Sequence, residues 1–579
     1  MVANICINGY HDGSISIVDE NGVVAHLLEE RFVHVKHQGP PMVCLSKIED
    51  YIDTFDDISF THLFHQFADF HWAISYLHYI SKVTTPDKLM SPMIHSGHHD
   101  LHAICGFSHS GFDDAIVVVI DGAGSTFKYG KENQTIYEIY NSSMQIMEKN
   151  IVGDGTIVDE SDCPLYVNKK TNIGAGYVYA GITEACGFNA LDCGKTMGLS
   201  AYGEEDSSIP ELLSFSDGGN KNFVLGGKPN LEFQGYVFAV LKKYPIKEFI
   251  MDNDNMDCLI PPFNKLTDEQ KTVLTNYAYR VQKDYEDYLI ATCQRAIKNC
   301  RSKNLILTGG CALNCVANYK LLKSLPEDIT LYVEPVSDDS GVSLGGAYQS
   351  YGPNKILNKS FKLDNLYLGG QLSHSYKLED GESEYDVEPE HVAKLISLGN
   401  IVAIAQGRSE IGPRALGNRS ILFDPRVKDG RDIVNTVKKR EYFRPFAGTV
   451  LKEHAKEWFD LDRLDESPFM MYAVDALSDK KDKIPAILHI DGTCRIQTVT
   501  SKQNKNYYDL ISEFYKLTGV PILFNTSFNL AGDTMVETID DAFRTIRNSD
   551  INYMYLPEIN KLISVPYNLG KSTKPCYNL

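Results

Sequence analysis

Strand-like segments that end in acidic residues and glycines are the feature that most constrains the fold of this 579-residue chain. The three segments are AIVVVIDGAG at 115–124, NLILTGGCALN at 304–314 and LYVEPVSDDSGVSLGG at 331–346. Helical stretches lie between them, and Asp268–Asn299 has the clearest helical spacing of apolar and aromatic residues. This alternation predicts an α/β fold whose ligand site lies at the carboxyl ends of the strands.

The first 30 residues predict a small antiparallel meander. Its strands are expected at Ile5–Ile7, Ser14–Val18 and Val23–Leu28, and the turn after the first strand carries His11 and Asp12 at its tip. Much further along, the sequence becomes loop-like over Tyr351–Tyr367, and a second α/β segment then begins. We therefore expect two domains that divide near this loop.

Charge and cysteine content exclude several classes of protein. Lys and Arg number 56 against 76 Asp and Glu, so the net charge is −20, which disfavours broad binding to nucleic acids or anionic membranes. The 13 cysteines include no CxxC pair, which argues against a disulfide framework or a cysteine zinc finger. No secretory signal and no apolar run of roughly 20 residues is visible. The prediction is a cytoplasmic protein.

A histidine-rich segment, GHHDLHA at 97–103, is a candidate metal site. His98 and His102 are four residues apart, so on a helix they share one face and can bind one ion. Asp121 and Asp339, each after a strand, could supply carboxylates. Two imidazoles with carboxylate oxygens suit Fe(II), with zinc or manganese as alternatives. A polar helix face whose histidines bind nothing explains the same pattern equally well.

Basic residues are concentrated after residue 400, in an otherwise acidic chain. The segments are GRSEIGPRALGNRS at 407–420, KKREYFRPF at 438–446 and the arginine of HIDGTCRIQTV at 489–499. Arginine binds phosphate and carboxylate oxygens in a bidentate manner, so these segments predict an anionic ligand. The alternative is a set of structural arginines that tie loops to carboxylates. Asn525, Ser527 and Asn529 would share one side of an extended segment and bind a small polar ligand, unless they form an ordinary polar loop.

Considered together, these motifs resemble the O-carbamoyltransferases of antibiotic and nodulation-factor biosynthesis. The matching stretches cover nearly the whole chain: GYHDGSISIV, EERFVHVKH, GHHDLHA, VVIDGAGS, GKTMGLSAYG, TGGCALNCVAN, DDSG, GRSEIGPRALGNRSIL, REYFRPFA, HIDGTCRIQTV and ILFNTSFN. Their number and order make the resemblance specific, whereas no single motif would.

The resemblance implies two domains with separate tasks. Residues 1–362 would form a Kae-like, actin-like ATPase domain of two α/β halves, and residues 363–579 a YrdC-like open twisted α/β domain. The second domain would form carbamoyl adenylate from carbamoyl phosphate and ATP. The first would transfer the carbamoyl group to a hydroxyl of a small acceptor such as a sugar, a nucleoside or nucleotide, or a natural product.

The resemblance also assigns residues to these tasks. It implies metal ligands at His98, His102, Asp121 and Asp339, and a nucleotide loop at Gly309, Gly310 and Asn314. The carbamoyl-phosphate and adenylate pocket would contain Lys438, Arg440, Arg444, Arg495, Asn525 and Ser527, with Arg414 and Arg419 as further cofactor-binding candidates. His11 or Asp12 is the candidate base for the acceptor hydroxyl.

The expected cofactors are ATP as co-substrate and a divalent metal, with Fe(II) favoured and Mg or Mn accompanying ATP. The expected partners are carbamoyl phosphate, ATP and the acceptor, without a nucleic-acid polymer or a membrane and with a homodimer as the expected assembly. Ser207–Pro262 is a candidate wall of the acceptor pocket. The competing hypotheses are a tRNA-modifying threonylcarbamoyl-type transferase and a non-catalytic nucleotide- and metal-binding scaffold. Hydrogenase maturation is disfavoured because its zinc fingers need CxxC pairs.

Overall fold

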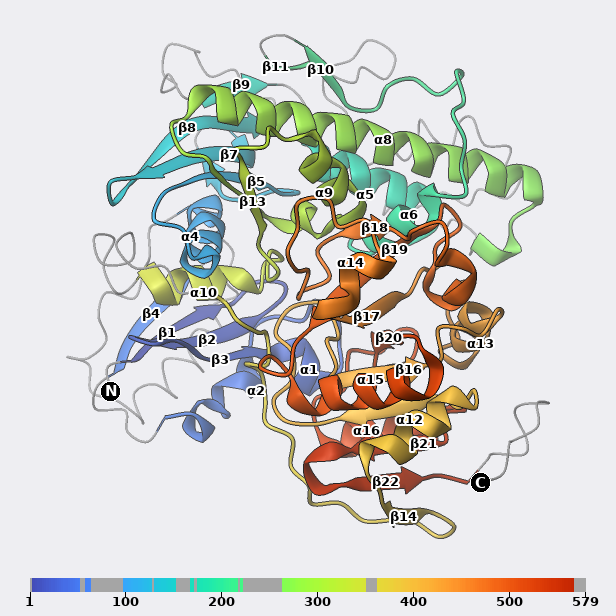
Figure 1. Ribbon diagram of the computed structural model, residues 1–579. Coiled ribbons are helices and arrows are strands. Elements are labelled where there is room, and N and C mark those ends of the chain that lie inside the picture. Colours follow the sequence, from blue (N-terminus) through green and yellow to red (C-terminus); the bar gives the residue numbers. More distant parts are fainter. Residues whose placement is uncertain are drawn as a thin grey trace, which may run out of the picture. The chain divides into compact units, whose positions relative to one another are not determined.

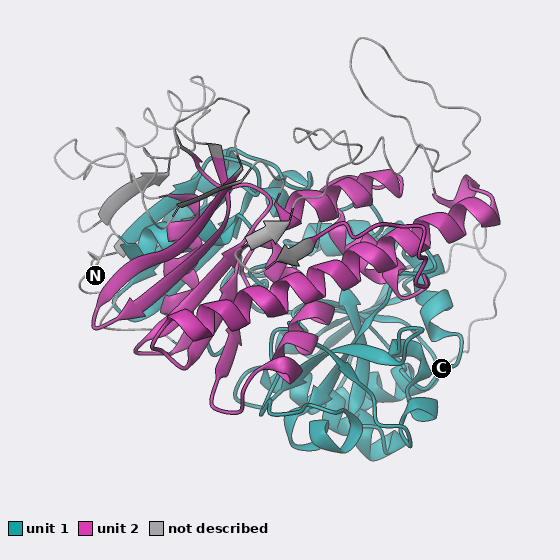
Figure 2. Cartoon of the chain, turned by 90° about the horizontal axis from the view of Figure 1, so that it is seen from above, with its two compact units in different colours: residues 1–94, 338–351, 361–579 teal, residues 95–337, 352–360 magenta. Residues whose placement is uncertain are grey.

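The computed structural model describes residues 3–52, 58–63, 97–127, 130–152, 167–170, 174–216, 219–221, 263–349 and 362–566 (Figure 1). By contacts, the chain divides into two compact units (Figure 2). Unit 1 comprises residues 1–94, 338–351 and 361–579, and unit 2 comprises residues 95–337 and 352–360. Most of the predicted boundary loop, and residues 222–262 of the candidate acceptor wall, lie outside the described residues.

The first sheet of unit 1 is the predicted meander. Its strands are β1 (Ala3–Asn8), β2 (Ser14–Asp19), β3 (Gly22–Leu28) and β4 (Ile58–Leu63), in the order β3-β2-β1-β4. β4 runs parallel to β1 and the other pairs are antiparallel. Helix α10 (Gly341–Gln349) packs against β1 and β2, whereas α1 (Glu29–Val33) and α2 (Met42–Leu45) follow β3 in the chain. The buried core of this sheet and its helices is mainly aliphatic. It contains Ile5, Ile7, Ile15, Ile17, Ala25, Leu27, Leu45 and Ile48.

The second sheet of unit 1 has nine strands in the order β14-β22-β21-β15-β16-β20-β17-β19-β18. The strands are β14 (Ser383–Asp386), β15 (Val402–Ala405), β16 (Arg419–Phe423), β17 (Ala447–Leu451), β18 (Ala473–Asp475), β19 (Thr493–Val499), β20 (Ile522–Ser527), β21 (Tyr553–Leu556) and β22 (Lys561–Ser564). The described helices of this part are α12 (Pro389–Ser397), α13 (Gly430–Val437), α14 (Ala455–Trp458), α15 (Lys505–Thr518) and α16 (Ile539–Arg547). Helices α12 and α15 pack against each other and against the sheet (Figure 1).

Unit 2 is built on a seven-stranded mixed sheet in the order β13-β12-β5-β7-β8-β9, with β6 paired to β7. The strands are β5 (Ala115–Ile120), β6 (Thr126–Phe127), β7 (Gly130–Tyr140), β8 (Ser143–Val152), β9 (Val167–Lys170), β12 (Asn304–Thr308) and β13 (Thr330–Val333). A hairpin, β10 (Ser214–Ser216) with β11 (Gly219–Lys221), stands apart from this sheet. The three parallel strands β5, β12 and β13 are those predicted to end in acidic residues and glycines.

Helices of unit 2 pack against the long helix α8 (Asp268–Asn299), whose bounds are those predicted. α8 contacts α5 (Ala175–Ala185), α6 (Cys193–Ser200) and α9 (Cys315–Ser324). It starts at a capping box, where Thr267 accepts a hydrogen bond from the Gln270 backbone N–H. Helix α4 (His98–Ser110) packs instead on β5 and β12, through Ala103 and Phe107.

The α/β class predicted from the sequence is confirmed, because both units combine mixed sheets with helices. The division at residue 362, and the likeness of its two parts to actin-like and YrdC-like domains, stay predictions. In the described part of the chain, each helix is too short or too polar to cross a bilayer.

Candidate functional site

The first candidate group lies in the N-terminal half of α4 in unit 2. The helix begins at His98, and Asp100 caps it by accepting a hydrogen bond from the Gly97 backbone N–H at 2.8 Å. His98 and His102 lie one turn apart, as predicted, and their Nε2 atoms are 3.0 Å apart. Both side chains are buried.

Asp121 directly follows β5 and completes this group within unit 2. Its Oδ2 lies 3.2 Å from His98 Nε2, and its Oδ1 accepts a hydrogen bond from the Gly310 backbone N–H at 3.3 Å. The donor atoms of His98, His102 and Asp121 lie within 4.8 Å of one another. Two imidazole nitrogens this close can share only one proton between them, whereas a metal ion accepts a lone pair from each. The donor set therefore fits a divalent ion such as Fe(II), zinc or manganese.

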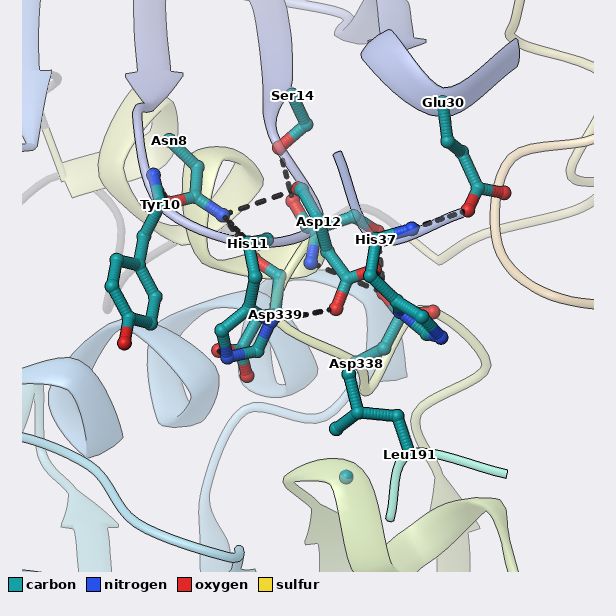
Figure 3. A network of polar contacts seen from close by, with 12 residues as sticks. Asn8, Tyr10, His11, Asp12, Ser14, Glu30, His37, Leu191, Asp338 and Asp339 are labelled. Atoms are coloured by element: carbon teal, nitrogen blue, oxygen red, sulfur yellow. Dashed lines mark hydrogen bonds and ion pairs between the residues drawn. The ribbon is translucent and has the colours of Figure 1, made fainter. Parts of the chain in front are cut away.

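A second candidate group is a polar network in unit 1, around the tip of the β1–β2 turn (Figure 3). His11 lies between two carboxylates: its Nδ1 is 3.0 Å from Asp12 Oδ2, and its Nε2 is 3.0 Å from Asp339 Oδ2. Asp12 also bonds to His37 Nδ1 at 2.7 Å. Asn8 supports the turn, because its Nδ2 donates to the carbonyls of His11 and Asp12 at 3.2 Å. The participation of Asp339 in a metal site with His98, His102 and Asp121 stays a prediction.

These contacts change the acidity of several groups. Burial acts to raise the pKa of Asp12, but hydrogen bonds with His11 and His37 outweigh it and lower this pKa. The hydrogen bond with Asp12 in turn raises the pKa of His37. Burial, aided by the charge of Asp12, raises the pKa of Asp338 to about 7. The His11 side chain is 37% exposed, and each of its two ring nitrogens faces a carboxylate.

The predicted nucleotide loop follows β12 in unit 2. Gly309 has a φ of +85°, and a Cβ there would lie 2.5 Å from the Ile120 carbonyl oxygen, so only glycine fits. Asn314 caps α9, because its Oδ1 accepts a hydrogen bond from the Ala317 backbone N–H at 3.1 Å. The Asn314 amide also bonds to Gln282. The loop thus brings the Gly310 N–H to Asp121, at the carboxyl ends of β5 and β12.

A third candidate group is a set of cations in unit 1, which we call the basic cluster: Lys438, Arg440, Arg444, Arg495 and Arg414. Lys438 follows α13 and is 2% exposed, and its Nζ donates to the Ser527 carbonyl and to Asn529 Oδ1. Burial and then the charges of Arg440 and Arg444 hold its pKa well below the ordinary lysine value.

Arg440 is subject to the same effects. Burial lowers its pKa well below the ordinary value, and the charges of Arg444, Arg495 and Arg414 add to this effect. The guanidinium lies 5.2 Å from the centre of the Phe446 ring. Like charges are therefore gathered in a poorly hydrated region, and this arrangement is stabilised when an anion binds.

Strands β20, β17 and β19 are successive neighbours in the sheet, and they carry polar residues next to the basic cluster. Asn525 and Ser527 both belong to β20, with one residue between them, so they face the same side as predicted. The Asn525 Nδ2 donates to the Ala415 carbonyl and to Thr449 Oγ1, at 3.2 and 3.0 Å. Asn525 is 1% exposed, and its Oδ1 has no hydrogen-bond partner within the described segments. A buried acceptor of this kind is suited to a ligand donor.

Arg419 has the contacts of a structural arginine. It is fully buried, and its guanidinium donates to the backbone carbonyls of Gln406, Gly407, Asn418 and Glu537. These contacts fit the alternative in which some arginines tie loops together, and a role of Arg419 in binding nucleotide stays a prediction.

Sequence reasoning did not single out His37, Asp338, Thr449 or Gln497. His37 closes the EERFVHVKH motif, so the motif itself is the signal that points to it. Thr449 and Gln497 bond to each other at 2.8 Å across the paired strands β17 and β19, and Gln497 also contacts Asn525. Such a cross-strand pair becomes visible only when the strand register is known.

Unit 2 thus holds an imidazole–carboxylate group at the end of β5, and unit 1 holds the basic cluster. Comparisons with known proteins show to which family the chain belongs. Residues 63–348 match the family described as carbamoyltransferase N-terminus, and residues 393–561 match carbamoyltransferase C-terminus. The chain therefore belongs to the carbamoyltransferase family and is an enzyme of carbamoyl transfer.

Two relatives from rhizobia illustrate the similarity. Nodulation protein NolO of Bradyrhizobium diazoefficiens is 32% identical over 470 residues, which cover 79% of this chain and 76% of that protein. Nodulation protein NolNO of Sinorhizobium fredii is 30% identical over 582 residues, which cover 94% of this chain and 77% of that protein. Among solved structures, full-length HypF in its phosphate- and nucleotide-bound form matches with a TM-score of 0.31 and 14% identity, over 62% of this chain and 56% of that one. A match at this TM-score adds nothing to the assignment.

Proposed function

We propose that this chain is an ATP-dependent O-carbamoyltransferase that uses carbamoyl phosphate and delivers the carbamoyl group to a hydroxyl of a small molecule. The observation that carries the proposal is the basic cluster, in which burial and neighbouring cations lower the pKa of both Lys438 and Arg440. Such a cluster favours a ligand with several negative charges, and both ATP and carbamoyl phosphate meet this requirement.

The proposed first half of the reaction takes place at the basic cluster. Carbamoyl phosphate is hydrolysed to carbamate and phosphate, and a carbamate oxygen then attacks the α-phosphorus of ATP. Pyrophosphate leaves, and carbamoyl adenylate remains. Arg440, Arg444 and Arg495 would bind the phosphate oxygens and offset charge in the transition state. The Asn525 Oδ1 would accept a hydrogen bond from the carbamoyl NH₂ group.

The proposed second half takes place in the N-terminal part of the chain. The acceptor hydroxyl attacks the carbamoyl carbon, AMP leaves, and His11 takes the hydroxyl proton, with Asp12 holding its ring. His98, His102 and Asp121, with Asp339 as the predicted fourth ligand, would hold a divalent ion, for which Fe(II) is favoured. Such an ion, when bound, polarises carbonyl or phosphoryl oxygens. Gly309, Gly310 and Asn314 would form the nucleotide loop of this part.

Carbamoyl adenylate reacts with water, so its transfer inside the protein would limit hydrolysis. Magnesium or manganese would accompany ATP. The net charge of −20 supports a small acceptor instead of tRNA. We also propose that the protein is cytoplasmic and forms a homodimer.

The experiment that tests the proposal is exchange of labelled pyrophosphate into ATP. Purified, metal-loaded protein should catalyse the exchange only when carbamoyl phosphate is present. Arg495→Ala should reduce the exchange at least 100-fold, and His98→Ala should leave it unchanged but abolish carbamoyl transfer. Arg463→Ala is the matched control, because this arginine pairs with Asp462 on the surface.

Two outcomes would contradict the proposal. Absence of exchange in folded wild-type protein would exclude the adenylate and would favour a non-catalytic scaffold. Equal loss of exchange in the Arg495 and His98 variants would exclude a division of the reaction between two sites. Mass spectrometry of the products from a panel of hydroxyl compounds then identifies the acceptor.

A further inference from the structure

The C-terminal half of α4 carries a second group of metal-type side chains in unit 2. Cys105 and His109 lie one helical turn apart, and Glu334 directly follows β13. Cys105 Sγ is 3.7 Å from His109 Nδ1, and His109 Nδ1 is 3.1 and 3.2 Å from the two carboxylate oxygens of Glu334. Cys105 is 1% exposed, and His109 and Glu334 are fully buried.

The geometry differs from that of a nucleophile–base–carboxylate triad. In a triad, the histidine contacts the nucleophile through one ring nitrogen and the carboxylate through the other. Here, the thiol and the carboxylate both approach the same atom, His109 Nδ1. One ring nitrogen cannot donate a proton to the carboxylate and accept one from the thiol at the same time. Three donor atoms that lie this close to one another can all bind a single metal ion.

The distances between the donors fit tetrahedral zinc. Zinc bonds of roughly 2.3 Å to sulfur and 2.0–2.2 Å to nitrogen and oxygen place neighbouring ligand atoms roughly 3.3–3.6 Å apart. The observed separations are 3.7 Å for sulfur and nitrogen and 3.1 Å for nitrogen and oxygen. All three donor atoms lie within 4.8 Å of one another. Thiolate with imidazole and carboxylate is a set that zinc accepts and that magnesium and calcium do not.

Neighbouring residues hold the donors in place. The Glu334 carboxylate accepts hydrogen bonds from the Val336 backbone N–H at 3.0 Å and from the Tyr332 hydroxyl at 3.3 Å, so its orientation is fixed. Gly106 allows α4 to approach the sheet closely: a Cβ there would lie 3.0 Å from Ile306 Cγ2 and 3.7 Å from Glu334 Cβ. A larger residue would move Cys105 and His109 away from Glu334.

We propose that Cys105, His109 and Glu334 bind one zinc ion, with water as the fourth ligand, in a structural site separate from the group at His98 and His102. Binding converts the Cys105 thiol to a thiolate, and the released proton passes to solvent. The ion would attach the C-terminal half of α4 to the segment after β13. It would thereby hold the helix that carries His98 and His102. This inference concerns a structural metal and does not depend on the proposed reaction.

Cobalt substitution tests the site, because only a thiolate ligand gives an intense near-ultraviolet charge-transfer band with Co(II). The full-length protein is expressed with cobalt, and the spectrum and bound-metal content are measured. The wild-type protein should show the thiolate band. Cys105→Ala should lose the band and one equivalent of metal, whereas His98→Ala and the matched control Cys293→Ala should keep the band. Cys293 is also buried, on α8, and does not belong to the cluster.

The wild-type spectrum alone is decisive if Cys105→Ala fails to fold, since absence of the band in folded, cobalt-loaded protein would overturn the proposal. Survival of the band in Cys105→Ala would also overturn it, because another cysteine would then be the ligand. Glu334→Gln provides a second variant that keeps the thiolate. It should retain a weaker band with altered visible absorption, and an unchanged spectrum would exclude Glu334 as a ligand.

Discussion

The ion pair between Lys149 and Glu132 connects strands β8 and β7 inside unit 2. Its side chains are 5% and 0% exposed. Glu132 Oε1 also accepts hydrogen bonds from the backbone N–H groups of Ser125 and His99, at 3.0 and 3.2 Å. Because His99 lies in the first turn of α4, this carboxylate fixes the start of the helix that carries His98. We predict that Lys149→Met destabilises unit 2 by about 3 kcal/mol and loosens the start of α4.

The direction of the effect follows from the pKa of Glu132, which is lowered from 4.5 to about 2. Burial acts to raise this pKa, and the charges of His99 and Lys149, with the Ser125 N–H, lower it further than burial raises it. Burial also lowers the pKa of His99 to about 4, so His99 is neutral at pH 7 and Lys149 supplies the positive charge. Part of the shift comes from the charge of His99, which is absent at pH 7, so the expected effect of Lys149→Met is the usual cost of removing one partner of a buried ion pair, about 3 kcal/mol.

The effect of pH has a definite sign. The pKa of Glu132 is lower in the folded state than in the unfolded state, so its contribution is present above pH 4.5 and disappears as the pH falls from 4.5 towards 2. Lys149→Met lacks most of this contribution. The difference in the free energy of unfolding between wild type and variant should therefore be largest near pH 7 and should shrink below about pH 4.

Urea unfolding followed by far-ultraviolet circular dichroism at pH 7 and pH 3 measures the difference, and hydrogen exchange over residues 98–110 assigns it to α4. Lys303→Met is the control, since Lys303 and Asp328 form a pair whose side chains are both 61% exposed, and its effect should stay below about 0.5 kcal/mol. Removing both charges with Glu132→Gln and Lys149→Met together should restore most of the stability. Equal effects of Lys149→Met and Lys303→Met, or no recovery in the double variant, would refute the explanation.

Three further predictions concern the other parts of the site. Arg440→Met should raise the melting temperature of the unliganded protein and abolish the stabilisation by inorganic triphosphate that wild type shows in thermal-shift measurements, because it removes a repelled, buried cation. Unchanged stabilisation by triphosphate would contradict this role. The raised pKa of His37 means that its bond to Asp12 stabilises the fold below about pH 6.5 and is lost as the pH rises through the folded value. His37→Gln should remove this pH dependence, and NMR titration of the histidine in Asp12→Asn should show a lower pKa. Gly309→Ala should lower the free energy of unfolding by at least about 2 kcal/mol, because the added Cβ would lie 2.5 Å from the Ile120 carbonyl oxygen. Urea unfolding measures this loss. An unchanged free energy of unfolding would show that the loop tolerates a side chain.

Local patterns predicted much of the fold correctly. The helix Asp268–Asn299 and the β1–β3 meander were predictable because spacing along the chain determines which face is buried. The placement of Asp121 after β5 was predictable for the same reason, since an apolar run that ends in aspartate and glycine stops at that point. These features depend on residues that are close together in sequence.

Contacts between distant segments were not predictable in this way. Glu334 meets His109 across 225 positions of sequence, and Asn525 meets Thr449 across 76. Neither contact leaves a local pattern, because each depends on which strands are neighbours and in what register. The structural role of the Arg419 contacts was equally hidden, because a buried arginine that bonds to carbonyls has the same sequence appearance as one that binds phosphate.

Helix α4 connects the two metal-type groups through a single physical requirement. His98, His102, Cys105 and His109 follow spacings of four, three and four, so they form one stripe along a helix. A buried stripe of this kind is usually apolar, since each buried polar group needs a partner to offset its loss of water. Here the stripe meets a carboxylate at each end, Asp121 near the start of α4 and Glu334 near its end. Packing alone would favour leucine or valine at these positions. The stripe therefore agrees with the two proposed metal groups, and the same helix carries both of them.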